Sequence, residues 1–302
     1  MALYNGNLKL IAVTGPTGAG KSTFINRVCG SDLKVGTGLR SCTTNIDVAH
    51  CMIGDTKVVL IDTPGFDDTT RSQADVLEDI GKFLKKTYER DVLLSGVIYM
   101  HRISDRRVGG IARENFRLFG KICGPNAMKN VLIVTSMWED VSEEIGRARE
   151  QELASKPIFY QPAIEAGAKM IRHYNHAESA RTAISILLDN SAQELQMQYE
   201  LVEQKKQVPE TAAGVDLHQL LREQEERYQR QLQDLADEMK DANRAEVTKL
   251  REELKKTREE LRRTKREAEK MEVGSVRRLL QAGFRVEFRT LFCLKVYRVL
   301  ES

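Results

Sequence analysis

A glycine-rich turn between an apolar stretch and a helix-like stretch constrains the fold of this chain more than any other feature. Residues 8–14 (LKLIAVT) form an apolar run of strand length, and residues 22–29 have the apolar spacing of a helix. The turn between them fits the pattern GxxxxGK[ST]. Its glycines let backbone N–H groups point inward, and the helix N-terminus adds partial positive charge. The stretch therefore predicts a phosphate-binding loop, or P-loop, that joins a strand to a helix.

The residue types in this loop predict a nucleotide site with a magnesium ion. Lys21 would reach the β- and γ-phosphate oxygens, and the Ser22 hydroxyl would bind Mg²⁺. A chance match is the alternative, but the strand pattern before the loop and the helix pattern after it argue against chance. The residues that we expect to contact the nucleotide here are Gly15, Thr17, Gly18, Ala19, Gly20, Lys21, Ser22 and Thr23.

A second apolar strand ends in an acidic residue. Residues 58–61 lead directly into Asp62, Thr63, Pro64 and Gly65. If this strand lies parallel to the first, its carboxylate stands on the magnesium side of the loop, and Gly65 offers an N–H to the γ-phosphate. A surface turn built from Asp, Pro and Gly is the alternative.

The polar segment between these two strands contains a candidate sensor of the third phosphate. Residues 35–48 (VGTGLRSCTTNIDV) hold two glycines and end in adjacent threonines before a predicted strand. We expect Thr43, or failing that Thr44, to bring its hydroxyl and N–H to Mg²⁺ and the γ-phosphate. The preference of threonine for strands explains the pair equally well.

Three motifs in this order, GPTGAGKS, SCTTN and DTPGFDD, resemble those of translation-factor-class GTPases. More narrowly, the chain is similar to the AIG-type (GIMAP, immunity-associated) family, whose plant relatives include septin-like chloroplast import receptors. HRISDRRVGG after the strand SGVIYMH, followed by NVLIVTSMWEDV, resembles fungal AIG-like proteins with a C-terminal coiled coil. The resemblance covers about residues 8–190. It implies GTP and GDP as ligands, Mg²⁺ as cofactor and a homodimer formed through the G domains.

The box that reads guanine in GTPases is altered in this chain. Trp138 stands where an Asp normally accepts hydrogen bonds from the guanine N1 and N2 groups. Three explanations remain open: Glu139 or Asp140 replaces that Asp, Trp138 stacks on the base, or Trp138 is a packing residue at the sheet edge. From the loop after the last predicted strand, the resemblance implies that Asn175 contacts the base.

The catalytic residues also depart from the general pattern. Phe66 follows the DTPG box where many small GTPases have a Gln that orients the attacking water, so we expect slow hydrolysis. The resemblance implies that Arg102 acts in trans as an arginine finger across a dimer. Lys21 and Thr43, assigned above from their motifs, complete the set of residues that we expect to be catalytic. In the alternative, Arg102 helps His101 and Asp105 hold the loop that precedes the next helix.

The fold that we expect is α/β: a P-loop NTPase domain (Ras-like or septin-like) over residues 1–190, with a mostly parallel sheet sandwiched by helices. A helical linker over 191–214, a coiled coil over 215–272 and a basic amphipathic tail over 273–302 follow it. Apolar residues keep a four-three spacing up to Ala242 and resume it out of step from Val247, which suggests a coiled coil with a skip near 243–246. A single solvated helix with i,i+4 charge pairs is the alternative.

Composition limits the partners and the location. The formal net charge of the 302 residues is +3, and no basic patch is interleaved with aromatics, so we expect no nucleic-acid partner. The five cysteines are widely spaced and indicate neither a disulfide framework nor a zinc site. No long apolar run occurs, and a cytoplasmic location is the default. The basic tail could touch an anionic membrane; an incorrectly assigned gene end explains it equally well.

Together these features predict a GTP-binding switch with slow, dimerisation-stimulated hydrolysis. The alternative is a GTP-binding scaffold that does not hydrolyse GTP and acts through its coiled coil. The absence of the guanine-reading Asp also leaves an ATP-using P-loop protein open.

Overall fold

The computed structural model describes residues 8–31, 47–63, 65, 71–106, 108–241 and 244–272, with the side chains of 239–248 excepted. Thr43, Thr44, Phe66 and the tail over 273–302 lie outside the described residues, so the expectations placed on them remain predictions. Contacts within the chain divide the described residues into two units, 8–205 and 206–272.

The first unit is built on a six-stranded sheet with the order β2-β3-β1-β4-β5-β6. Its strands are β1 (Leu8–Thr14), β2 (Asp47–Ile53), β3 (Thr56–Asp62), β4 (Gly96–Arg102), β5 (Val131–Ser136) and β6 (Lys169–Arg172). Edge strand β2 is antiparallel to β3, and the other neighbours are parallel. The central strands are apolar and buried along most of their length, as expected for strands covered on both faces.

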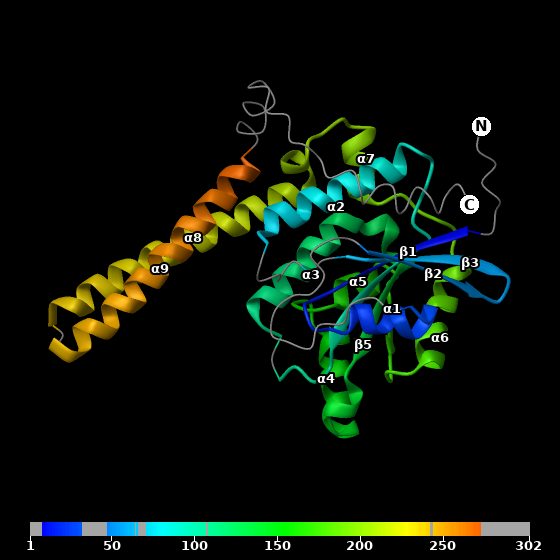
Figure 1. The fold of residues 1–302 in the computed structure, drawn as a ribbon, viewed down its shortest axis with the longest axis horizontal. Coiled ribbons are helices and arrows are strands. Elements are labelled where there is room, and N and C mark those ends of the chain that lie inside the picture. The colour runs from blue at the N-terminus through cyan, green and yellow to red at the C-terminus, as the bar shows by residue number, and fades with distance from the viewer. Residues whose placement is uncertain are drawn as a thin grey trace. The chain divides into compact units, whose positions relative to one another are not determined.

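Helices cover both faces of this sheet (Figure 1). In chain order they are α1 (Lys21–Cys29), α2 (Gln73–Tyr88), α3 (Gly110–Cys123), η1 (Pro125–Asn130), η2 (Trp138–Asp140), α4 (Glu143–Ser155), α5 (Gln161–Glu165), α6 (Ala177–Leu188) and α7 (Gln196–Val202). Helices α1 and α6 pack together over one face, and α2 and α3 lie on the other with α7 against them. Because five of the strands run parallel, their carboxyl ends lie at the same edge of the sheet. The loops that form the site follow these ends.

Helix α7 lies in the segment expected to be a linker, yet it packs within the first unit. Gln198 is fully buried, and its Nε2 donates to the Thr87 hydroxyl of α2 at 3.2 Å. The first unit thus extends beyond residue 190, to residue 205.

The second unit is a helical hairpin over the segment in which the sequence predicts a coiled coil with a skip. After η3 (Val208–Glu210) comes α8 (Ala212–Asp241), and α9 (Arg244–Met271) runs back along it (Figure 1). Lys265 on α9 lies 3.5 Å from Glu225 on α8, as the antiparallel direction requires. The break in the apolar repeat is therefore a chain reversal, and the seam joins two helices of one chain instead of leaving a single solvated helix.

Helix α8 begins within the predicted linker because its N-terminus is capped. The Thr211 hydroxyl accepts the Gly214 N–H at 3.0 Å, so Gly214 lies inside the helix and does not break it. In the described part of the chain, no helix combines the length and the apolar character needed to cross a bilayer.

Candidate nucleotide-binding site

The P-loop follows β1, and its glycines are required by the backbone. Gly15 has φ +136°, and a Cβ there would lie 2.4 Å from the carbonyl oxygen of Met100 in β4. Gly18 and Gly20 also have positive φ, at +77° and +87°. These are backbone conformations that L side chains rarely adopt. The loop can therefore pass close to β4 and present backbone instead of side chains to a ligand.

Lys21 begins α1 and turns back into the loop. Its side chain is buried, and Nζ donates to the carbonyl oxygens of Gly15 at 2.9 Å and Pro16 at 3.0 Å. The ammonium group therefore lies inside the turn formed by the loop. The other predicted loop residues occupy the same turn and the first turn of α1: Gly18 is exposed, Thr17 and Thr23 are half-buried, and Ala19 is buried.

Ser22 and Asp62 form the pair of oxygen donors that was predicted for magnesium. The Ser22 hydroxyl donates to Asp62 Oδ2 at 2.6 Å, and Asp62 is 1% exposed. Parallel pairing of β1 with β3 sets Val13 opposite Asp62, which brings the carboxylate beside the loop. Thr63 fastens this strand end because its hydroxyl donates to the Val13 carbonyl at 3.0 Å. A carboxylate and a hydroxyl at a helix N-terminus are the hard oxygen ligands that Mg²⁺ favours, so these residues fit the ion.

Arg102, the last residue of β4, lies against the P-loop of its own chain. Its Nη1 is 3.1 Å from the position that a Cβ on Gly18 would occupy, and its Nε lies 3.2 Å from Asp105. The ion pair with Asp105 is the contact expected for a loop-holding role. The guanidinium also brings positive charge to the exposed side of the loop.

His101 precedes Arg102 and faces the interior. Its Nδ1 and the Tyr160 hydroxyl are 2.8 Å apart, and the ring is buried. Burial, with a smaller effect of the Arg102 charge, lowers the pKa of His101 from 6.5 to about 4. The imidazole is therefore neutral at physiological pH and holds the end of β4 in place.

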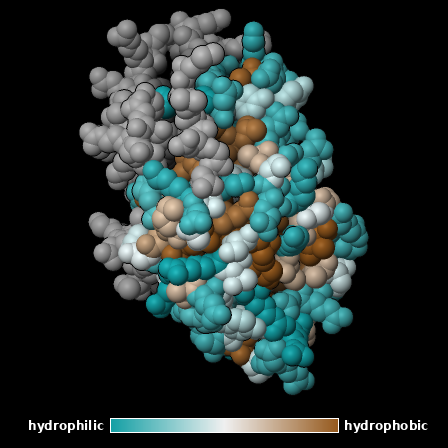
Figure 2. Space-filling model, turned by 90° about the vertical axis from the view of Figure 1, so that its right-hand side faces the viewer, coloured by the Kyte–Doolittle hydropathy of each residue, from teal (hydrophilic) through white to brown (hydrophobic). Residues whose placement is uncertain are grey.

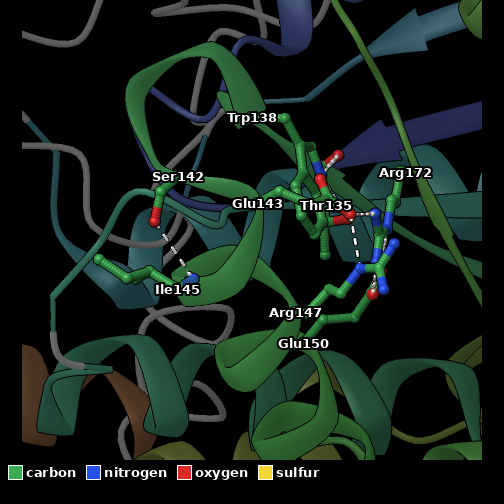
Figure 3. A network of polar contacts seen from close by, with 8 residues as sticks. All are labelled: Thr135, Trp138, Ser142, Glu143, Ile145, Arg147, Glu150 and Arg172. Atoms are coloured by element: carbon green, nitrogen blue, oxygen red, sulfur yellow. Dashed lines mark hydrogen bonds and ion pairs between the residues drawn. The ribbon is translucent and has the colours of Figure 1, made fainter.

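Trp138, in the altered guanine box, is a buried packing residue (Figure 3). Its indole N–H donates to the Thr135 hydroxyl at 3.0 Å, and the Arg172 guanidinium lies 4.1 Å from the ring centroid. Helix α4 approaches the ring so closely that a Cβ on Gly146 would lie 2.5 Å from it. Of the explanations left open by the sequence, the structure shows the packing role for Trp138, because burial leaves 6% of the residue exposed and no open face for a base.

Arg172 holds this arrangement together. From β6 its guanidinium reaches two carboxylates of α4, Glu143 at 2.8 Å and Glu150 at 2.5 Å, while it covers Trp138 (Figure 3). The hydrogen bonds to Glu150 raise the pKa of Arg172, so the side chain remains charged. The tryptophan, the arginine and α4 thereby fix the loop that follows β5.

Glu139 and Asn175 meet at the surface next to this packed group. Asn175 Nδ2 donates to Glu139 Oε1 at 3.3 Å, and both residues are exposed. Asn175 has φ +54°, a left-handed conformation that turns the chain from β6 toward α6. Because Trp138 points inward, Glu139 is the residue of the altered box that presents a carboxylate outward beside Asn175.

Two site residues were missed from the sequence. The Ser136 hydroxyl donates to the Ala19 carbonyl at 2.9 Å and ties β5 to the P-loop. Met137 has φ +60°, and its Cε lies 3.7 Å from the position of a Cβ on Gly20. The signal that could have identified them is their place at the carboxyl end of a parallel strand, where ligand-binding loops gather.

Comparisons with known proteins find a GTPase family model and GTPase relatives. A protein-family model described as 50S ribosome-binding GTPase matches residues 10–118, less than half of the chain. The Translocase of chloroplast 90, chloroplastic, of Arabidopsis thaliana is 26% identical over 189 residues, 60% of this chain and 22% of that protein. The tRNA modification GTPase MnmE of Mesoplasma florum is 28% identical over 161 residues, 53% of this chain and 32% of that protein. The chain thus spans less than a third of the length of either relative.

Among solved structures, Toc33 from Arabidopsis thaliana in complex with GDP and Mg²⁺ has 18% sequence identity and a TM-score of 0.47, covering 62% of this chain and 87% of that one. The P-loop, the order of the strands and the family match define a class: the chain contains an α/β P-loop GTPase domain with a mostly parallel sheet, followed by a helical part. The predicted fold class is confirmed.

Proposed function

We propose that this protein binds GTP with Mg²⁺, hydrolyses it slowly and acts as a nucleotide-dependent switch akin to the AIG-type GTPases. The observation that carries the proposal is the 2.6 Å contact between Ser22 and the buried Asp62 beside a loop that requires glycine. The AIG-type kinship rests on the motifs quoted above, including the His101-Arg102 box at the end of β4.

In this proposal the chain positions phosphates more than it takes part in bond making. The loop N–H groups and Lys21 hold the phosphate oxygens, while Ser22, Asp62 and Thr43 hold the metal. Bound Mg²⁺ supplies charge neutralisation between the phosphates. Phe66 offers no hydrogen bond to an attacking water, and slow turnover follows. We propose that Gly65 contributes an N–H to the γ-phosphate.

We propose that Glu139, supported by Asn175, reads the guanine base in place of the usual Asp. Its exposed carboxylate can accept the N1 and N2 hydrogens of guanine, groups that adenine does not present in the same way. Glu139→Gln should weaken GTP binding by about 10- to 100-fold, because a hydrogen bond to a charged group contributes about 1.5–3 kcal/mol, and should leave ATP binding unchanged. Glu144→Gln, an exposed glutamate of α4, is the matched control. Equal GTP affinity in Glu139→Gln and wild type would exclude this role.

We further propose that two G domains associate when GTP is bound and that Arg102 then stabilises the charge of the transition state. The test is phosphate release with Mg²⁺ and either GTP or ATP across a wide range of protein concentration. A GTP-selective rate per protomer that rises with concentration supports a finger supplied by a second copy. Arg102→Ala should abolish the rise, and the exposed Arg106→Ala should retain it. A rate that is independent of concentration and of Arg102 contradicts the proposal.

A non-hydrolysing scaffold is the second candidate, favoured by Phe66 and by the α8–α9 hairpin, which offers a long charged surface. Its signature is GTP-dependent thermal stabilisation with no phosphate release at any protein concentration. We propose a cytoplasmic location for either role, with membrane contact through the basic residues of 273–302.

A further inference from the structure

The structure brings together two cysteines that are 22 positions apart in the sequence. Cys29 is the last residue of α1, and Cys51 lies in β2. Helix α1 packs against β2, and the two thiols lie close enough to shift each other's pKa. Along β2 the alternation of side chains places Cys51 on the face of the buried Ala49, toward α1, whereas His50 and Met52 are exposed.

Both thiols are at the rim of the core and not in its centre. They are half-buried and pack beside Ile53 against the cluster formed by α1, α6 and the sheet. The side of the first unit that carries the β2–β3 turn and α6 shows hydrophobic residues in its middle and hydrophilic residues around them (Figure 2). A small oxidant can therefore reach the pair, while the packed surroundings keep the two sulfurs together.

The surroundings also make the two thiols unequal. The hydrogen bond from Cys29 lowers the pKa of Cys51, and the positive charge of Arg181 on α6 acts in the same direction. Burial of Cys123, in contrast, raises the pKa of its thiol far above the usual range. Cys51 is thus the better nucleophile, with Cys29 in place to react second, and Cys123 is an inert reference within the same unit.

The geometry points to a redox modification site: Cys29 and Cys51 form a dithiol that a peroxide converts to an intrachain disulfide. The Cys51 thiolate attacks one peroxide oxygen, the O–O bond breaks, hydroxide leaves and Cys51 becomes a sulfenic acid. Cys29 then attacks that sulfur while its thiol loses the proton, forms the S–S bond and releases a second hydroxide. The two thiol protons convert the hydroxides to water, so two electrons pass from the thiols to the peroxide.

The disulfide would link two elements that carry or support the nucleotide site. Helix α1 bears Lys21 and Ser22, and β2 pairs with β3, which ends in Asp62. A covalent bond between α1 and β2 restricts the relative motion of Ser22 and Asp62. Oxidation should therefore change GTP turnover, a consequence that rests on the proposed function, whereas formation of the disulfide does not.

The test uses the full chain treated with hydrogen peroxide and digested under non-reducing conditions. Trypsin and Asp-N together release Cys29 in residues 28–31 and Cys51 in residues 47–54, with Cys42 in a separate peptide. We expect a linked pair of the first two peptides, lost on treatment with dithiothreitol. A disulfide that joins Cys51 to Cys42, or the absence of any disulfide while Cys51 is oxidised, would overturn the proposal.

Serine variants assign the two roles. Cys29→Ser should stop Cys51 at a sulfenic acid that dimedone traps, Cys51→Ser should leave Cys29 unreacted, and Cys123→Ser should form the disulfide like wild type. Equal dimedone trapping in Cys29→Ser and wild type contradicts resolution by Cys29. Phosphate release from oxidised wild type and oxidised Cys29→Ser then tests separately whether the disulfide changes GTP turnover. A difference between the two proteins supports regulation. Measurable turnover that is identical in both excludes regulation, but it does not contradict formation of the disulfide.

Discussion

At the scale of single residues, buried charged groups define the site. Lys21 and Asp62 are both buried, yet each contacts parts of the loop or its neighbouring helix. Burying charged groups is costly unless they have partners, and here the partners are the groups that would surround a phosphate and its metal. The residue-level predictions therefore concern protonation and charge in this region.

Lys21→Ala should abolish GTP binding, because the variant removes the positive charge from the cradle. We expect affinity to fall by more than about 100-fold, since charge-assisted hydrogen bonds are roughly twice as strong as neutral ones and several are lost together. Isothermal titration calorimetry measures this directly. Lys156→Ala, at the exposed lysine that follows α4, is the control. If Lys21→Ala bound GTP as tightly as this control, the P-loop assignment would be wrong.

His101 should make the protein less stable as the pH falls below neutral. Its pKa is about 4 in the folded chain against an ordinary value of 6.5, so the unfolded chain takes up the proton first. The stabilisation is complete above about pH 6.5 and is lost as the pH falls toward 4. It amounts to about 2 kcal/mol between pH 7.5 and 5.

Denaturant unfolding of wild type and His101→Gln at both pH values checks this. The loss of unfolding free energy on acidification should be smaller in the variant by that amount. An identical pH dependence in the two proteins would show that His101 is accessible to protons in the folded state.

At the scale of elements, strand ends and helix packing decide which side chain faces the nucleotide. In the altered guanine box, Trp138 turns inward under Arg172 and against α4, and Glu139 remains exposed. A small residue in α4 is necessary for this arrangement, because Gly146 lies directly against the indole.

Gly146→Ala should therefore destabilise the first unit, although alanine is the better helix former. The added Cβ would be 2.5 Å from the Trp138 ring, and relieving the clash should cost about 1–3 kcal/mol. Gly120→Ala in α3, where a Cβ meets nothing within 4 Å, is the matched control and should be neutral or stabilising by up to about 1 kcal/mol. Thermal unfolding of both variants measures the contrast. Equal stability of the two would mean that the indole has room to move.

At the scale of the whole molecule, the helical part satisfies its own apolar seam. Leu235 on α8 and Leu250 on α9 are buried, and the ion pair between Glu225 and Lys265 joins the two helices. An intrachain hairpin does not need a second copy to bury this seam, in contrast to a coiled coil formed between chains.

The melting temperature of the isolated segment 206–272 should therefore be independent of its concentration. Circular dichroism over about a hundredfold range of concentration tests this, since an association equilibrium makes the melting temperature rise with concentration. The same segment shortened to residues 206–241, which lacks α9, is the control and should lose most of its helicity. A melting temperature that rises with concentration in 206–272 would show pairing between chains.

The sequence by itself determined the local pieces of this protein. The apolar run and the glycines of the P-loop predicted β1 and its turn, and the apolar spacing of residues 22–29 predicted the helix α1. The sequence also predicted that Asp62 lies beside the loop, because parallel strands align their carboxyl ends, and the structure shows Asp62 at this position. Periodicity and turn chemistry act between neighbours in the chain, and these features depend on little else.

Only the tertiary structure decided which distant residues meet. The packing role of Trp138 became clear only in the structure, where β6 places Arg172 over the indole ring. The same pairing of β5 with β6 brings Glu139 within hydrogen-bond distance of Asn175. The spacing of apolar residues in the helical part does not show whether the chain continues in one direction or reverses. The packing of α9 against α8 shows that it reverses. Such contacts depend on strand order and helix packing, which follow from how the whole core is buried and not from the spacing of residues along the chain.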